Sequence, residues 1–152
     1  MTTILLVLLL SGEQSFDQKV VVKLTEMLGV ETPGKIMIER VEEKELLSDL
    51  KQYMMRDCLQ GRIDRFPYCS EAIRNSNMFV HGIWLEKERN VLHIKLHKHA
   101  GLDALIHEFC HWYLHHLTKP PGMLNNHEVL LPLAMTLLVS EEFVSWLEKE
   151  KQ

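Results

Sequence analysis

The 152-residue chain is poor in the residues that mark several kinds of protein. Its three cysteines, Cys58, Cys69 and Cys110, are an odd number and include no Cys-x-x-Cys pair, which argues against a disulfide framework and against a cysteine-rich zinc finger. Glycine (7) and proline (5) are sparse. Disordered and low-complexity chains are often rich in these residues, so the composition argues against such a chain. The chain has no basic block and a net charge of −4, so nucleic acid is not an expected partner.

The apolar run nearest the N-terminus is also too short to cross a membrane. It spans residues 4–10, whereas a bilayer requires about 20 apolar residues. The run lacks the positively charged start and the small-residue cleavage site of a secretory signal. We interpret it as a buried strand, and we expect a cytoplasmic protein with no membrane partner.

The pattern that is present predicts one α/β (α+β) domain over residues 1–152. Ser15 and Gln18 form a capping box, and Gly29 can close the helix that follows them. Apolar periodicity predicts a strand at 35–41, a helix at 42–59, a β-hairpin at 79–97 and helices at 102–117 and 126–149. We expect a small twisted sheet that contains the hairpin and is backed by the two early helices, with the last two helices as the other wall of a cleft. Residues 62–78 have no clear period and are interpreted as an irregular connection.

The helix predicted at 102–117 carries a His-Glu-x-x-His pattern at His107, Glu108 and His111. Residues four apart on a helix lie about 40° apart around its axis and about 6 Å apart along it, so both imidazoles can bind one ion. The apolar residues of this segment lie between about 140° and 260° from His107; they are Leu102, Leu105, Ile106, Phe109, Trp112 and Tyr113. We therefore expect the two histidines to face a cleft and the opposite side to face the core.

The residue types suit hydrolysis by a metal-activated water. Neutral imidazoles leave a zinc ion its full charge, which brings the pKa of a bound water down to about 7. Glu108 lies about 60° from His111 around the helix, so its carboxylate can reach that water without replacing an imidazole. A carboxylate there accepts the proton of the water as general base and later returns it to a leaving amine. Hydrolysis of a peptide bond requires both the metal-activated water and this proton transfer.

This segment resembles the active-site helix of the zincin metallopeptidases, and it is similar to that of the compact ImmA/IrrE-type and gluzincin-like members. The resemblance covers about 60 residues, from the hairpin near Phe79 to the last helix. It implies that His107 and His111 bind one zinc ion and that Glu108 is the general base. It also implies that the strand at 91–97 is the edge strand along which an extended peptide substrate binds.

The third metal ligand has several candidates. Gluzincin-like proteins take a glutamate from the helix after the motif, and Glu128 lies 17 positions beyond His111. The neighbouring His127 would suit other zincins, and Glu141 and Glu142 lie near the spacing of some ImmA-type proteins. Glu128 can equally be a first-turn acid that favours the helix dipole. Pro132 lacks the amide that would bond to carbonyl 128, so we expect the helix to kink or restart there.

The other polar and aromatic residues that we considered have structural interpretations. We expect solvated strand histidines at 93, 97 and 99, a helix-end cation at His115, and core packing for Tyr113, Cys110, Trp84, Trp112 and Trp146. Cys69 is a less favoured candidate for a regulatory thiolate on the metal.

The predicted function is that of a zinc-dependent peptidase acting on a peptide or protein. The alternative is a zinc-binding module, either non-catalytic or latent, that binds a protein partner through the edge of its hairpin. The pattern predicts neither the substrate specificity nor the oligomeric state, although the apolar stretch at 129–139 suits a dimer interface as well as a core.

Overall fold

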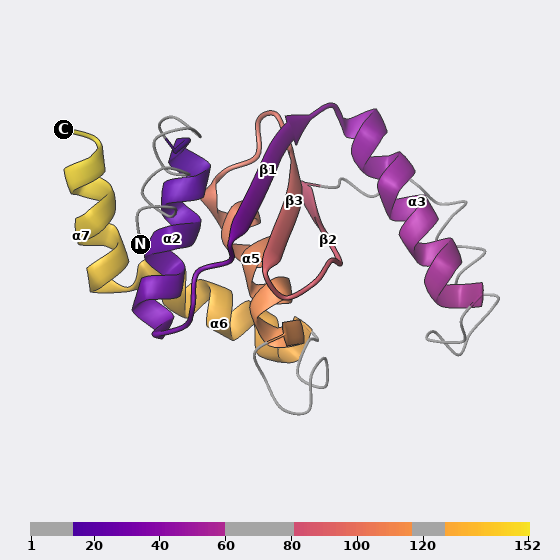
Figure 1. Cartoon of the computed structure of the whole chain (residues 1–152). Coiled ribbons are helices and arrows are strands. Elements are labelled where there is room, and N and C mark those ends of the chain that lie inside the picture. The colour runs from indigo at the N-terminus through magenta and orange to yellow at the C-terminus, as the bar shows by residue number, and fades with distance from the viewer. Residues whose placement is uncertain (1–13, 60–80, 117–126) are drawn as a thin grey trace, which may run out of the picture.

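The computed structural model describes residues 14–59, 81–116 and 127–152, apart from the side chains of residues 53–59 and 127. The strand predicted at 4–10 and the connection at 62–78 lie outside these ranges. Figure 1 shows the elements, which are α2 (Phe16–Leu28), β1 (Lys35–Val41), α3 (Glu43–Leu59), β2 (Gly82–Leu85), β3 (Val91–His97), α5 (Leu102–His116), α6 (His127–Val139) and α7 (Glu141–Glu150). The predicted mixed α/β fold class is confirmed.

The first described helix has the ends that its sequence predicts. The Ser15 side chain accepts a hydrogen bond from the Gln18 amide, and the Gln18 side chain accepts one from the Ser15 amide, so the capping box is complete. Gly29 closes α2 in the left-handed conformation, with φ of 66°, which glycine adopts without the steric cost of a Cβ atom.

The described sheet has three strands in the order β1-β3-β2. β2 and β3 pair in antiparallel fashion, which confirms the predicted hairpin, and β1 pairs with β3 in parallel. β3 is therefore the central strand, and the expectation that residues 91–97 form the edge strand is wrong. The parallel partner β1 comes from much earlier in the chain, and no local pattern around residues 91–97 reveals such a pairing.

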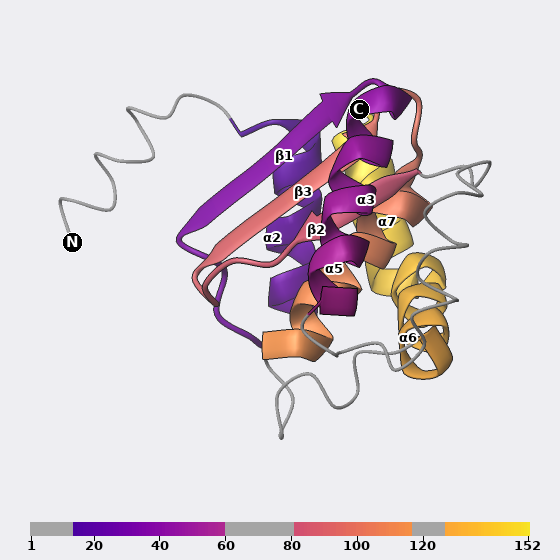
Figure 2. The ribbon, with the colours of Figure 1, turned by 90° about the vertical axis from the view of Figure 1, so that its right-hand side faces the viewer.

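The two early helices lie on opposite faces of the sheet, so the expectation that both back it together is wrong. Leu92, Ile94 and Leu96 of β3 point to one face and form a core with α2, α5, α6 and α7. On the other face, Leu46 of α3 packs against Ile83 of β2. Figure 2 shows α3 in front of the sheet, with α2 and α5 behind it.

The helix predicted at 126–149 is two helices. Of the kink or restart expected at Pro132, the restart is wrong, because α6 continues through this residue. The chain bends by 52° between α6 and α7. Ser140, which separates them, is extended and caps α7 by accepting a hydrogen bond from the Phe143 amide. A serine cap interrupts a helix without interrupting its apolar pattern, which is why periodicity alone missed the break.

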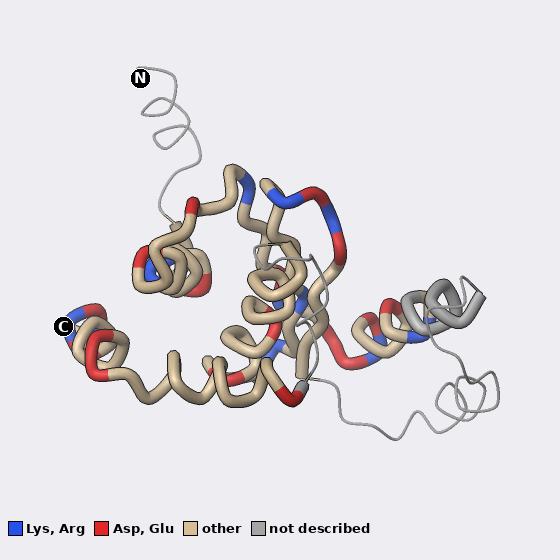
Figure 3. Tube along the Cα trace, turned by 90° about the horizontal axis from the view of Figure 1, so that it is seen from below, with Lys and Arg blue, Asp and Glu red and all other residues tan. Residues whose placement is uncertain are grey.

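α6 has an exposed apolar side. Glu128 is its one residue among Asp, Glu, Lys and Arg, and Figure 3 shows the long tube of this helix without these residues beyond its first turn. Leu131, Met135 and Val139 are all more than half exposed, whereas Leu130 and Leu137 are buried in the core. Among the described residues no single helix has the length and apolar character needed to cross a membrane; α6 and α7 meet that test only together, as a bent pair.

Candidate metal site

Helix α5 places the site against the sheet. The predicted apolar side is largely confirmed, because Leu105, Ile106, Phe109 and Trp112 are at most 1% exposed. Burial extends further around the helix than expected, since the sheet and α6 both pack against α5. His107 and His111 lie at the edge of this contact and are half-buried.

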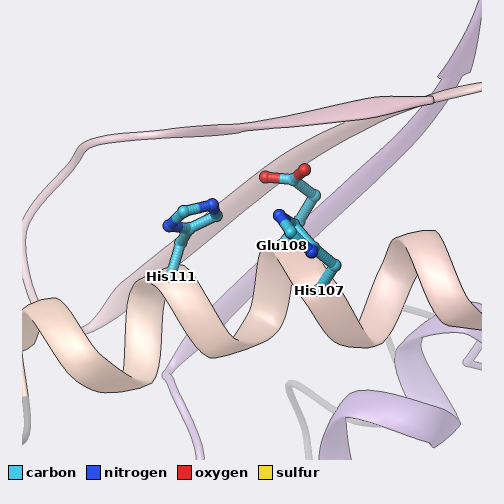
Figure 4. A group of neighbouring side chains, drawn as sticks. All are labelled: His107, Glu108 and His111. Carbon is cyan, nitrogen blue, oxygen red and sulfur yellow. The ribbon is translucent and has the colours of Figure 1, made fainter. Parts of the chain in front are cut away.

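The three residues of the motif lie together. The ring centroids of His107 and His111 are 5.0 Å apart, with an angle of 71° between the ring planes. One ligand atom from each of His107, Glu108 and His111 lies within 4.8 Å of the other two. Figure 4 shows both imidazoles and the carboxylate on the same side of the helix, beneath the strands. The predicted juxtaposition of the two imidazoles is confirmed.

This donor set fits a divalent transition-metal ion. Zinc binds imidazole nitrogen and carboxylate oxygen at about 2.0–2.2 Å, so tetrahedral ligand atoms lie about 3.3 Å from one another. Because the three donors lie within 4.8 Å of one another, modest side-chain rotations would bring them to that spacing. The structure thus shows a group that could hold a metal ion, and imidazole is a ligand shared by zinc, iron, copper and nickel.

Glu108 is far more buried than the motif alone suggests. Glu108 is 8% exposed, and its carboxylate accepts a hydrogen bond from the backbone amide of Trp84 on β2. Burial raises the pKa of its carboxyl to about 7, because removal from water disfavours the charged form, while the hydrogen bond acts in the opposite direction. The site therefore contains a carboxyl group that gains and loses a proton close to neutral pH.

Trp84 is the residue that sequence reasoning missed at this site. The prediction of core packing is confirmed, since Trp84 is 9% exposed. Its indole also stacks on the His111 ring, with centroids 6.4 Å apart and planes 10° apart, and it contacts His115 and His116. The strand alternation that sends Trp84 to the same side as Ile94 was a usable signal, because that side carries α5.

The end of α5 has a second group of histidines. His115 Nε2 lies 3.1 Å from Glu86 Oε1, so His115 has a carboxylate partner there besides its place at the helix end. His116 follows it, and burial lowers its pKa below the usual histidine value, with the neighbouring His115 acting in the same direction. The rings of both residues contact the Trp84 indole.

The candidates for a third ligand whose side chains the structure describes, Glu128, Glu141 and Glu142, are not in the group. Glu128 lies in the first turn of α6 with an exposed side chain, and it is not among the atoms that lie within 4.8 Å of one another. Glu141 and Glu142 lie in the first turn of α7, where Glu142 Oε1 is 3.1 Å from Lys23 Nζ on α2. The His127 side chain lies outside the described residues. Glu128 as third ligand stays a prediction.

Four of the remaining candidates lie in the described part of the chain; they are His93, His97, His99 and Cys110. His93 Nε2 lies 2.6 Å from Glu39 Oε2 on β1, and the His97 and His99 rings are 5.5 Å apart at the end of β3. Cys110 is buried in the core, which confirms its predicted packing, and burial raises the pKa of its thiol to about 12. Cys69 lies outside the described residues.

No protein-family model, curated protein or solved structure matches the chain. What is shown is therefore the geometry of the chain's own residues: a His-Glu-His group on one turn of a helix, packed under a strand of a mixed sheet.

Proposed function

We propose that the protein is a zinc-dependent peptidase of the zincin type. The observation that carries this proposal is the convergence of His107, Glu108 and His111, whose ligand atoms lie within 4.8 Å of one another on one turn of α5. The resemblance of the motif and of the hairpin before it to the zincins supports the same reading. We expect a peptide or protein substrate and one zinc ion.

Each residue has a role in this proposal. His107 and His111 hold the zinc ion, together with a third ligand that we expect to be Glu128. When bound, zinc supplies Lewis-acid chemistry, polarising a carbonyl and lowering the pKa of water. Glu108 is the general base: its carboxyl has a pKa of about 7 in the described environment, so it can take a proton from water and release it to a leaving amine at neutral pH.

The edge strand supports a peptide substrate. β2 is an edge of the described sheet and runs beside Glu108. An extended peptide can add to such an edge through main-chain hydrogen bonds to groups other than the Trp84 amide, which Glu108 already occupies. Side-chain pockets would provide selectivity. The role that the resemblance assigned to residues 91–97 thus passes to Gly82–Leu85.

One observation favours a second candidate, a zinc module without catalytic activity. Glu108 is 8% exposed and is already held by the Trp84 amide. A buried and hydrogen-bonded carboxylate suits a structural metal ligand, because structural zinc sites are closed by protein side chains. In that case the edge of the hairpin would bind a protein partner.

Metal analysis and two variants test the proposal. Protein purified without chelators should contain one zinc per chain, and His111→Ala should lose it, because one of two imidazole ligands is gone. His99→Ala, which removes an exposed histidine outside the group, should keep the metal. Absence of stoichiometric metal from the wild type would contradict both candidates.

Glu108→Gln separates the two candidates. A peptidase should keep its zinc and lose about 10²–10⁴-fold in the cleavage rate of an unfolded protein such as casein, since the general base is removed. A non-catalytic module should show no cleavage in the wild type. Cleavage that persists in Glu108→Gln would contradict the role of Glu108 as general base.

A further inference from the structure

Edge strand β2 meets the candidate site at two residues on the same side of the sheet. We propose that Gly82 and Trp84 are positioning residues of this site. Gly82 leaves the space in which the Glu108 side chain lies. Trp84 holds the Glu108 carboxylate through its backbone amide and the His111 ring through its indole. The part of this inference that concerns zinc rests on the proposed function, and the part that concerns Glu108 does not.

The strand register explains why the Trp84 amide is available to Glu108. The His97 amide donates to the His81 carbonyl over 2.7 Å, and these residues are directly opposite in the register that pairs Gly82 with Leu96. Hydrogen-bonded pairs alternate along an antiparallel ladder, so Ile83 and Leu85 bond to β3. The amides of Gly82 and Trp84 therefore point away from β3, and Glu108 accepts the bond from Trp84.

Gly82 provides the route to that amide. It shares a side of the sheet with Trp84, since both pair with residues of β3 that are buried toward α5. A Cβ atom on Gly82 would lie 3.2 Å from Glu108 Cγ and 2.7 Å from Leu96 Cδ2. The Glu108 side chain thus lies directly against the glycine and reaches the amide two residues further on. A side chain at position 82 would obstruct it.

The indole of Trp84 restrains the second ligand. It stacks almost parallel to the His111 ring, 10° from its plane, and it is itself held between the strand and the His115 and His116 rings. A ring that is packed on one face has fewer accessible rotamers, which keeps its nitrogen atoms directed toward the metal. One residue of β2 thereby orients two of the three residues in the group.

Hydrogen exchange of the Trp84 amide in the full-length, metal-free protein tests the role of the strand. An amide that points away from its partner strand exchanges quickly unless something accepts its hydrogen bond. We expect Glu108→Ala to speed exchange of the Trp84 amide at least about tenfold. Gly82→Ala should do the same, because the new methyl group displaces Glu108.

Two controls keep this test specific. The Leu85 amide, which bonds to β3, should exchange at the wild-type rate in both variants. Leu96→Val removes a methylene at the nearest contact of the new methyl group and should leave the Trp84 amide protected. Unchanged exchange of the Trp84 amide in Glu108→Ala would overturn the proposal. If Gly82→Ala alone left that exchange unchanged, the role of Gly82 would be overturned.

Zinc affinity, measured by competition with a chromophoric chelator, tests the indole. Trp84→Ala should weaken zinc binding about tenfold, because partners that orient a ligand are worth 10–100-fold in affinity. Trp84→Phe keeps an aromatic ring and should stay within about threefold of wild type. Trp146→Ala is the matched control: its ring stacks on Phe16 and Phe143, at α2 and α7, so it should leave the affinity unchanged.

Equal zinc affinity of Trp84→Ala and wild type would overturn the role of the indole. A wild type that binds no zinc would contradict the proposed function instead, and exchange of the Trp84 amide would still decide the role of the strand. The two failures are thus distinguishable.

Discussion

Glu108 is the residue of the group whose burial has the clearest consequence for stability. Its carboxyl is buried between α5 and β2, where it accepts a hydrogen bond from the Trp84 amide. An ionised carboxylate there loses much of its hydration, and one amide compensates for part of that cost. A bound cation would supply the missing charge. We therefore expect ionised Glu108 to destabilise the metal-free protein, and a bound metal ion to offset that cost.

This environment predicts a pH dependence for the metal-free protein. The pKa of Glu108 rises from 4.5 to about 7 on folding, so between these values the folded state holds a proton that the unfolded chain releases. The free energy of unfolding should therefore fall as pH rises through this window, by about 3 kcal/mol in total at pH 8. Urea denaturation of wild type and Glu108→Gln at pH 4.5 and pH 8 measures the difference.

Comparison of Glu108→Gln with wild type isolates the effect of Glu108, because the two proteins share all other titrating groups. Its stability relative to wild type should increase from pH 4.5 to pH 8. A relative stability that does not change with pH would show that Glu108 is not buried as described.

At the scale of elements, short polar signals decide where helices end. Ser15, Gln18 and Gly29 are correctly predicted because capping is local: each side chain or glycine meets a backbone group of its own helix. Ser140 follows the same rule, yet the apolar pattern on both of its sides suggests one helix. The 52° bend it makes allows α7 to pack against α2 instead of continuing along α6.

Removal of this cap should weaken the corner between α6 and α7. The Ser140 hydroxyl accepts from the Phe143 amide and donates to the Leu137 carbonyl, so Ser140→Ala leaves both without a side-chain partner. We expect a loss of about 1 kcal/mol in the free energy of unfolding, measured with urea. Ser140→Asn, another favoured capping residue, should retain most of it; an alanine variant as stable as wild type would contradict the role of the cap.

At the scale of the whole molecule, the sheet separates two hydrophobic clusters. The larger one joins α2, α5, α6 and α7 on the side of the candidate site, and the smaller one joins Leu46 and Ile83 on the other side. Because β2 contributes Trp84 to the larger cluster and Ile83 to the smaller one, both clusters stabilise the same sheet. The metal site should nevertheless depend only on the side that carries α5.

Zinc and core packing should therefore contribute independently to stability. Leu46 is fully buried on the far side of the sheet, so Leu46→Ala should cost about 2–5 kcal/mol. At a zinc concentration of about 100 times Kd, binding should add about 2.7 kcal/mol to wild type and to Leu46→Ala alike. Thermal and urea unfolding with and without zinc measure both effects. An increment that persists in His111→Ala would contradict binding at this site.

The sequence by itself determined what depends on neighbouring residues. The spacing of His107 and His111 places two imidazoles side by side, and the capping box starts α2. Alternation in residues 91–97 places Leu92, Ile94 and Leu96 on the buried face of β3. These features follow from helix and strand periods of a few residues, which can be counted along the chain.

Only the tertiary structure decided what depends on residues far apart. β3 is central because β1 pairs with it, α2 and α3 lie on opposite faces, and Glu108 is buried because Gly82 and Trp84 cross above it. Side-chain environment, pKa and access to an edge strand are set by which elements meet in space. A chain segment does not carry that information in its own period, because the partner that completes each contact lies elsewhere in the sequence.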